Sequence, residues 1–311
     1  MKEYYNIVCV ADEGYAQHTA VMLCSLFENN KDKSFRVFLF TNALKEYTTE
    51  WLQALCKKYH SHIEVITIAD EGIKDLPIGQ WTTMMYYKLF MPTILPKEIE
   101  RCLFLDVDMV INDNVTPLYH WDLQGSIIAA AEDIPDCVAI KERIGLSQED
   151  IYINSGVMVC DLRKWRQMEA QKPIFDFVRN VSSRIINEQD VLAIYFKGLI
   201  TLLPIRWNMV TFYYFREPKI FPKYLPFLAD SKKNPGIIHF AAPIKPWFRD
   251  CQHPFRYLYK YFLEKTDWGD NYVFPYWEKL TRRQRINKII KNFLNRYGFM
   301  KDSIYTVPVR K

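Results

Sequence analysis

The first two-thirds of the chain alternates between apolar, strand-like stretches and stretches with helical periodicity, and this alternation limits the possible folds more than any other feature. Strands that alternate with helices form a mostly parallel sheet with helices on both faces, which binds ligands beyond the C-terminal ends of its strands. The sequence therefore predicts an α/β fold of this kind. The expected strands cover residues 6–11, 35–40, 63–68, 101–105, 126–131 and 156–160. The expected helices cover 15–28, 44–59 and 81–91, the last closed by Pro92, and further helices begin at Asp161, at Pro173 and near Glu188.

The chain changes character after residue 200. Residues 201–270 are rich in proline and aromatic side chains, and we expect irregular structure that packs around the binding site. Beyond them, eight basic residues and no acidic one occur between Lys279 and Lys301, among apolar residues at helical spacing. The basic residues are Lys279, Arg282, Arg283, Arg285, Lys288, Lys291, Arg296 and Lys301, and the apolar ones are Ile286, Ile289, Ile290, Phe293, Leu294 and Tyr297.

This pattern predicts a main domain over residues 1–250 and a basic, helical C-terminal appendage over residues 251–311. The appendage either docks on the main domain or lies on an anionic membrane surface. No nucleic-acid partner is expected, because no nucleic-acid-binding fold accompanies the basic residues.

Several classes of protein lack support in the sequence. The first residues show no secretory signal, and no apolar run approaches the roughly 18 residues of a spanning helix. Seven cysteines without a Cys-x-x-Cys pair predict buried free thiols and a cytoplasmic location. The glycine patterns of dinucleotide-binding and P-loop proteins do not occur.

Two carboxylates, Asp106 and Asp108, follow the strand expected at residues 101–105. The strand period of two places both on one side of the chain, at the edge of the sheet where ligands bind. Paired oxygen ligands suit Mg²⁺ or Mn²⁺, and such an ion suits a diphosphate. An Asp-x-Asp pattern also arises by chance, as a solvated turn. The apolar runs on both sides and Val107 between the carboxylates favour the metal site.

His239 follows the apolar residues 236–238 and is a second candidate ligand. A lone histidine in such a place is more often a structural residue. Lys245, with Pro246 and Trp247, comes six residues later and favours a site in which an imidazole for the metal and an ammonium for a phosphate share one loop.

These residues belong to a set of segments that resembles glycosyltransferase family 8, which includes bacterial lipopolysaccharide galactosyl- and glucosyltransferases and, more distantly, glycogenin. The resemblance extends from about Ile7 to Trp247. The segments that carry it are Ala11-Asp12-Glu13-Gly14-Tyr15, Asp106-Val107-Asp108 with Asn112-Asp113-Asn114 and Pro117-Leu118, Asn154-Ser155-Gly156-Val157-Met158, Leu162-Arg163-Lys164-Trp165, Gln189-Asp190, and His239 with Lys245-Pro246-Trp247.

The resemblance implies a GT-A fold, which is Rossmann-like, for the main domain. It also implies a UDP-sugar donor and retaining transfer of a hexose, galactose or glucose, to a saccharide or glycolipid acceptor in cell-surface glycan or lipopolysaccharide assembly. Together with the basic appendage, this predicts a cytoplasmic enzyme held peripherally on the inner face of the plasma membrane.

The resemblance also implies residue roles. Asp106, Asp108 and His239 bind the metal, Mn²⁺ or Mg²⁺, and Asp106 also lies near the ribose. The remaining roles are these: Lys245 contacts the diphosphate, Asp12 and Tyr15 lie in the segment that contacts uridine, Lys88 lies near the donor, Asp133 and Asn154 hold the transferred sugar, and Gln189 lies beneath the anomeric carbon.

Three positions depart from the family pattern: Gly14 replaces a frequent Asn, Lys88 a usual Arg, and Ala242 a frequent Gly. These departures weaken the assignment of the donor more than the assignment of the fold. At position 88, for example, lysine keeps the positive charge but lacks the bidentate fork of arginine.

The mechanism and the function each leave alternatives open. An amide at position 189 is no strong nucleophile, which favours front-face displacement assisted by the departing phosphate oxygen, while double displacement through Glu188 or Asp190 stays open. A sugar nucleotidyltransferase and a non-catalytic protein that binds nucleotide sugars or glycans are the alternative functions. A sugar nucleotidyltransferase would be expected to have a Gly-rich basic loop near the N-terminus, and residues 11–15 do not form such a loop.

Overall fold

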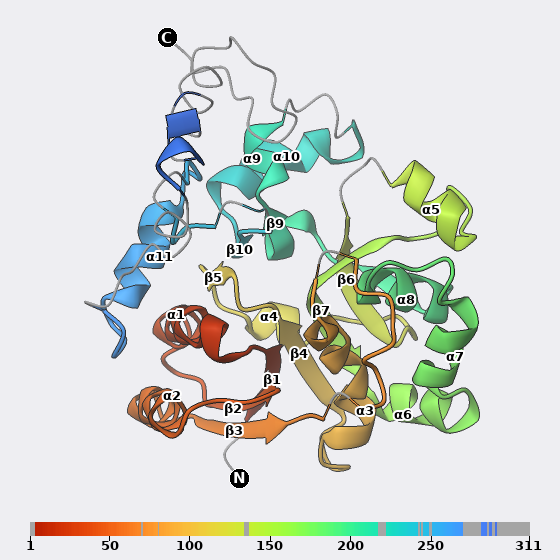
Figure 1. The fold of residues 1–311 in the computed structure, drawn as a ribbon, viewed down its shortest axis with the longest axis horizontal. Helices are drawn as coiled ribbons and strands as arrows, with labels where there is room; N and C mark the ends of the chain where they lie inside the picture. The colour runs from red at the N-terminus through yellow and green to blue at the C-terminus, as the bar shows by residue number, and fades with distance from the viewer. Residues whose placement is uncertain are drawn as a thin grey trace.

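The structure is a computed structural model that describes residues 4–69, 71–79, 81–133, 137–216, 222–241, 243, 245–248, 251–269, 281–284, 286, 287 and 290. Within these residues, seven strands form the main sheet in the order β3-β2-β1-β4-β7-β6-β8 (Figure 1). The strands are β1 (Tyr5–Val10), β2 (Phe35–Thr41), β3 (His62–Thr67), β4 (Arg101–Leu105), β6 (Ile128–Glu132), β7 (Ile153–Asp161) and β8 (Ile200–Leu202).

The main sheet is mostly parallel, as predicted. β1 pairs in parallel with β2 and β4, β2 pairs in parallel with β3, and β6 pairs in parallel with β8. β7 is the exception, because it runs antiparallel to both β4 and β6. All six expected strands are present, with ends displaced by a few residues.

Helices cover both faces of the sheet, as the alternation predicts. Along β1, Ile7 and Cys9 pack on one face with α1, α2 and α11, and Val8 packs on the other with η2, α3, α6, α7 and α8. The strand period of two explains why neighbouring residues enter different cores. The helices are η1 (Glu13–Tyr15), α1 (Ala16–Glu28), α2 (Glu46–Lys58), η2 (Thr83–Phe90), α3 (Met91–Ile94), α4 (Thr116–Tyr119), α5 (Val138–Ile144), α6 (Leu162–Gln171), α7 (Ile174–Val181), α8 (Glu188–Tyr195), η3 (Ile205–Asn208), α9 (Phe212–Phe215), η5 (Pro222–Tyr224), α10 (Leu225–Lys233) and α11 (Arg256–Leu263).

A second, smaller sheet was not predicted. Within the described residues it joins β5 (Met109–Ile111), β10 (Ile237–His239) and β9 (Met209–Val210) in the order β5-β10-β9. β10 pairs antiparallel with β5 and parallel with β9. These strands have two or three residues each, too short for an alternating pattern to distinguish them from loops.

Two local expectations were wrong. Pro92 does not close a helix; it lies in the first turn of α3, where its missing N–H costs nothing. The region 201–270 is less irregular than expected, because it contains β8 to β10 and the helices α9 to α11. Their shortness and their aromatic content hid the periodicity. By contrast, Asp161 caps α6 as predicted, since its side chain accepts from the backbone N–H of Lys164.

All seven cysteines lie in the described residues as buried free thiols, as predicted. No helix in the described part of the chain is long and apolar enough to cross a membrane.

α11 lies beside α1 at the edge of the molecule (Figure 1). Its buried residues Tyr259, Phe262 and Leu263 belong to the same core as α1 and β1. Most of the predicted basic helix lies outside the described residues. Where it is described, at 281–284, 286, 287 and 290, Ile286 and Ile290 are exposed. The boundary at residue 250 and the role of the appendage stay predictions.

Candidate active site

Asp106 and Asp108 lie in the short connection from β4 to β5. The backbone N–H of Asp106 donates to the carbonyl oxygen of Gly156 on β7 over 2.8 Å. Val107 is buried between the carboxylates. The connection is thereby fixed at the C-terminal end of β4, the edge at which the sequence predicts ligand binding.

His239 reaches the two carboxylates through strand pairing. β10 pairs with β5 so that His239 stands opposite Met109, and the N–H of Phe240 donates to the carbonyl oxygen of Asp108 over 2.9 Å. The Nε2 atom of His239 lies 3.3 Å from Oδ1 of Asp108 and 3.9 Å from Oδ2 of Asp106. His239 is the last residue of a strand, so the expected single loop shared with Lys245 is wrong, although the two side chains do meet at Asp108.

These three side chains can hold a metal ion. One ligand atom from each lies within 4.8 Å of the other two, and no other such group of three occurs in the described parts of the chain. Two carboxylate oxygens and an imidazole nitrogen suit a divalent ion such as Mn²⁺ or Mg²⁺.

Gly156 leaves room beside these ligands. A Cβ at this position would lie 2.5 Å from Cε1 of His239 and 2.9 Å from Oδ2 of Asp106, closer than side-chain atoms approach. The space therefore depends on glycine because of close approach rather than backbone conformation.

Two lysines balance the carboxylates. Nζ of Lys245 donates to Oδ2 of Asp108 over 2.5 Å and to the carbonyl oxygen of Phe240 over 2.9 Å. Burial opposes ionisation of Asp108, but the charge of Lys245, together with the neighbouring His239, outweighs it and holds the pKa of Asp108 well below its usual range. For Asp106, burial prevails over the nearby charge of Lys88 and raises the pKa.

Lys88 lies behind Asp106. It is 3% exposed, and its Nζ is 3.4 Å from Oδ1 of Asp106, 2.9 Å from Oε1 of Glu188 and 3.2 Å from Oγ of Ser155. Burial opposes its charge, but Asp106 and Glu188 raise the pKa of Lys88 above its usual value. Lys88 is therefore a buried cation that contacts Asp106 directly.

The predicted sugar-site residues form a hydrogen-bonded group. Nε2 of Gln189 donates to Oδ2 of Asp133 over 2.7 Å, and Oε1 of Gln189 accepts from the N–H of Ser155 over 3.1 Å. Oδ1 of Asn154 accepts from the N–H of Gly156 over 3.2 Å. The structure thus brings Gln189, Asp133 and Asn154 together next to the candidate metal ligands.

The segment from Asp12 to Tyr15 lies beside Trp247. Asp12 caps η1 by accepting from the N–H of Tyr15. Tyr15 is 40% exposed and makes an edge contact with Trp247, which stacks on His18 at 3.4 Å between ring centroids. The predicted uridine segment and the Lys245-Pro246-Trp247 segment are therefore neighbours.

Sequence reasoning missed Asn208, gave no role to Ser155, and considered Glu188 only as a possible nucleophile. Asn208 ends η3, is 1% exposed and contacts both Asn154 and His239. Nothing in the sequence around Asn208 signals this role. Ser155 and Glu188 adjoin the predicted residues Asn154 and Gln189, and that adjacency was the available signal.

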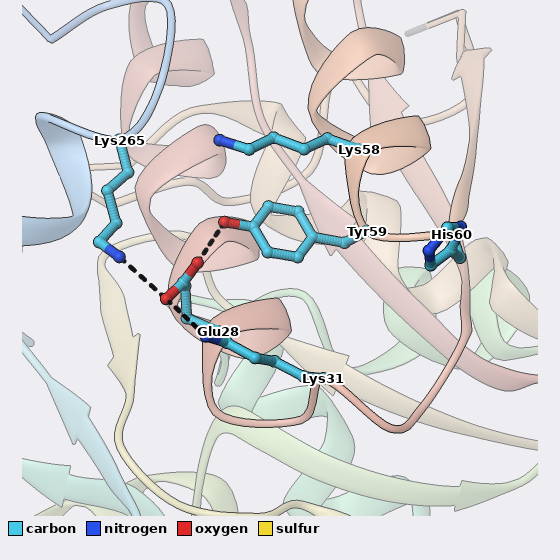
Figure 2. A pocket seen from close by; sticks show the side chains of 6 residues that line it. All are labelled: Glu28, Lys31, Lys58, Tyr59, His60 and Lys265. Atoms are coloured by element: carbon cyan, nitrogen blue, oxygen red, sulfur yellow. Dashed lines mark hydrogen bonds and ion pairs between the residues drawn. The ribbon is translucent and has the colours of Figure 1, made fainter.

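A separate pocket of about 370 Å³ lies where α1, α2 and α11 end, and none of the predicted site residues line it (Figure 2). Glu28 is at its centre, accepting from the hydroxyl of Tyr59 and from Lys265. The Tyr59 hydrogen bond is the main reason why the pKa of Glu28 falls to about 2. Because Glu28 already binds these partners, its contacts hold the ends of the three helices together.

Comparison with known proteins relates this geometry to a family. The model of glycosyl transferase family 8 matches residues 6–251. General stress protein A of Bacillus subtilis is 25% identical over 277 residues, covering 86% of this chain and 96% of that protein. A lipopolysaccharide 1,2-glucosyltransferase of Escherichia coli K12 is 25% identical over 275 residues, covering 86% of this chain and 80% of that protein.

Among solved structures, the galactosyltransferase LgtC, in complex with donor and acceptor sugar analogues, superposes with a TM-score of 0.75 at 22% identity. The match covers 86% of this chain and all of LgtC. The similarity confirms the predicted GT-A fold for the part of the chain that it covers.

Proposed function

The chain belongs to glycosyl transferase family 8, and we propose that it transfers a hexose, galactose or glucose, from a UDP-sugar to a saccharide or glycolipid acceptor with retention of configuration. The name of the similar lipopolysaccharide glucosyltransferase supports a role in cell-surface glycan assembly, including lipopolysaccharide, and the name of the galactosyltransferase LgtC supports hexose transfer. The observation that carries the proposal is the cluster of Asp106, Asp108 and His239 with Lys245 bound to Asp108.

In this proposal Asp106, Asp108 and His239 hold Mn²⁺ or Mg²⁺. When bound, the ion would act as a Lewis acid that neutralises the charge of the departing UDP. Lys245 supplies a fixed positive charge for the diphosphate, because its Nζ already lies at the edge of the ligand cluster. Asp12 and Tyr15 hold the uridine from the opposite side.

Lys88 acts through Asp106 rather than on the donor itself. Its side chain is buried, and its hydrogen bonds go to Asp106, Ser155 and Glu188. It keeps the Asp106 carboxylate oriented and lowers the cost of two neighbouring negative charges.

Asp133 and Asn154 hold the transferred sugar, and Gln189 lies beneath its anomeric carbon. Gln189 is fixed at both ends of its amide, by Asp133 and by Ser155, which suits a group that must keep one orientation during transfer. Its amide group is a weak nucleophile.

The surroundings of the two nearby carboxylates support front-face displacement. Asp190 is fully buried, with Oδ1 bound by Tyr152 and Oδ2 bound by Arg143 and the N–H of Ile186. Oε1 of Glu188 accepts from Lys88 and Ser155. Carboxylates engaged in this way are poorer nucleophiles, so the departing phosphate oxygen is the base that we propose for the incoming hydroxyl.

UDP release from a panel of UDP-hexoses tests the activity and separates an enzyme from a binding protein. Asp108→Ala should lower metal-stimulated release by about a hundredfold or more, since the charge of a bound metal is worth several kcal/mol. His239→Ala should be milder, because water can replace the imidazole. The control is Asp176→Ala, which removes an exposed carboxylate on α7. Equal turnover of Asp108→Ala and Asp176→Ala in the presence of Mn²⁺ would exclude the proposal.

We also propose that the appendage places the enzyme peripherally on an anionic cytoplasmic membrane surface. Each Lys or Arg near such a surface contributes about 1 kcal/mol, and the segment from Lys279 to Lys301 has eight. Co-sedimentation with anionic vesicles should exceed that with neutral vesicles and weaken at high salt. Truncation after Trp277 should remove this binding and leave UDP release unchanged; indifference to lipid charge would leave the appendage as packing.

A further inference from the structure

We infer that Asn208 is a positioning residue that fixes the tautomer of His239, so that Nε2 presents its lone pair to the ion held with Asp106 and Asp108. The inference rests on the proposed metal site. Asn208 lies at the junction of η3 and β9. Its side-chain hydrogen bonds to Asn154 and His239 are both 2.8 Å long.

The direction of each hydrogen bond follows from one obligate donor. The backbone N–H of Gly156 points to the side-chain amide of Asn154, so the atom that receives it is the carbonyl oxygen Oδ1. The same Oδ1 lies 2.8 Å from Asn208, which must therefore offer its NH₂ group there. The amide of Asn208 then turns its own oxygen, Oδ1, toward Nδ1 of His239.

An amide oxygen only accepts, so Nδ1 of His239 must carry the proton. In the neutral ring Nε2 is then unprotonated, and this is the nitrogen that faces Asp108 Oδ1 at 3.3 Å and Asp106 Oδ2 at 3.9 Å. A metal-binding histidine generally depends on such a partner at its other nitrogen for its orientation and basicity.

Burial makes the arrangement rigid. Asn208 is 1% and His239 3% exposed, so water cannot readily replace a lost partner. Gly156 also lies against the ring, which limits its rotation. The side chain of Asn208 also connects Asn154, which is proposed to hold the sugar, with the proposed metal ligand His239.

Mn²⁺ titration of the purified, metal-free protein, followed by electron paramagnetic resonance, tests the inference without measuring activity. Asn208→Leu should weaken Mn²⁺ binding about tenfold to a hundredfold. Asn208→Asp keeps an oxygen acceptor for Nδ1 and should stay closer to the wild type. The matched control is Asn112→Ala, which removes a side-chain hydrogen bond to Pro235 beside β10 without touching His239. Circular dichroism confirms that each variant is folded.

The nitrogen chemical shifts of the His239 imidazole give a second readout in the metal-free protein. The neutral ring should be the Nδ1–H tautomer in the wild type and a mixture in Asn208→Leu. An Nε2–H tautomer in the wild type, or equal Mn²⁺ affinity of Asn208→Leu and Asn112→Ala, would overturn the inference. If the wild type binds no Mn²⁺, the proposed metal site fails, and the tautomer then decides the role of Asn208 alone.

Discussion

Gly156→Ala tests whether the metal site depends on a space that only glycine leaves. The added Cβ would lie 2.5 Å from Cε1 of His239 and 2.9 Å from both Oδ2 of Asp106 and Cε of Met109. Ordinary contact begins at 3.4 Å, so the imidazole must retreat by about 0.9 Å and the carboxylate by about 0.5 Å. The methionine end can bend, but His239 is held by Asn208 and by its strand.

These displacements exceed the roughly 0.2 Å within which metal–ligand distances vary. We therefore expect Mn²⁺ affinity to fall by about tenfold to a hundredfold, the range found when the support of a metal ligand is lost. Overpacking of a filled site should also cost about 1–3 kcal/mol of unfolding free energy, which lowers Tm by several degrees in a chain of this size.

Isothermal titration with Mn²⁺ and thermal unfolding without metal measure the two effects separately. Gly72→Ala is the control, since a Cβ there meets no atom within 4 Å and its backbone is not in the left-handed region. It should leave both quantities nearly unchanged. Wild-type Mn²⁺ affinity in folded Gly156→Ala would refute the reasoning.

Three further predictions concern catalysis, donor binding and pH. Gln189→Ala should lower kcat about tenfold to a thousandfold with little change in donor Kd, as rapid-quench and binding assays can show. Lys245→Ala should weaken UDP binding, and Lys245→Arg should restore part of it, measured by titration with UDP and Mn²⁺. Burial lowers the pKa of His18 and of His253 to about 3, from 6.5 when exposed. Between pH 3 and pH 6.5 the unfolded chain therefore binds more protons than the folded chain. The contribution of each buried ring to the free energy of unfolding should be complete above about pH 6.5 and should fall toward pH 3 by up to about 1.4 kcal/mol per pH unit. In His18→Phe, Tm measured across this range should fall less steeply.

The inner strands of the main sheet were predictable because they are apolar runs that are largely buried, whereas the edge strand β3 is partly exposed. Ile7, Val8 and Cys9 are all fully buried, but they enter two different cores. Such runs identify a strand of a covered sheet without any need for alternation. Asp106 and Asp108 were predictable for the same reason, since a charged pair directly after such a run must lie at a strand end.

The partners of these carboxylates were harder to predict, because they depend on pairings between distant segments. His239 meets Asp108 only because β10 aligns with β5, and a shift of one residue would turn the imidazole to the other face. Neither strand is long enough for the sequence pattern to predict which residues of the two strands pair. Asn208 comes from a third segment, whose place is set by the pairing of β9 with β10.

The direction of β7 explains why residues from opposite ends of two strands share one site. In a parallel sheet the ligand edge is formed by the residues that follow each strand, as Asp106 follows β4. β7 runs the other way, so its first residues rather than its last lie at that edge, with Val157 opposite Leu105. Asn154, Ser155 and Gly156 are consequently brought to the metal ligands by being at the start of their strand. A single reversed strand in a parallel sheet thus supplies the amide, the hydroxyl and the glycine that lies against the ligands, and the rule for parallel strands, applied to sequence alone, would have placed them at the opposite edge.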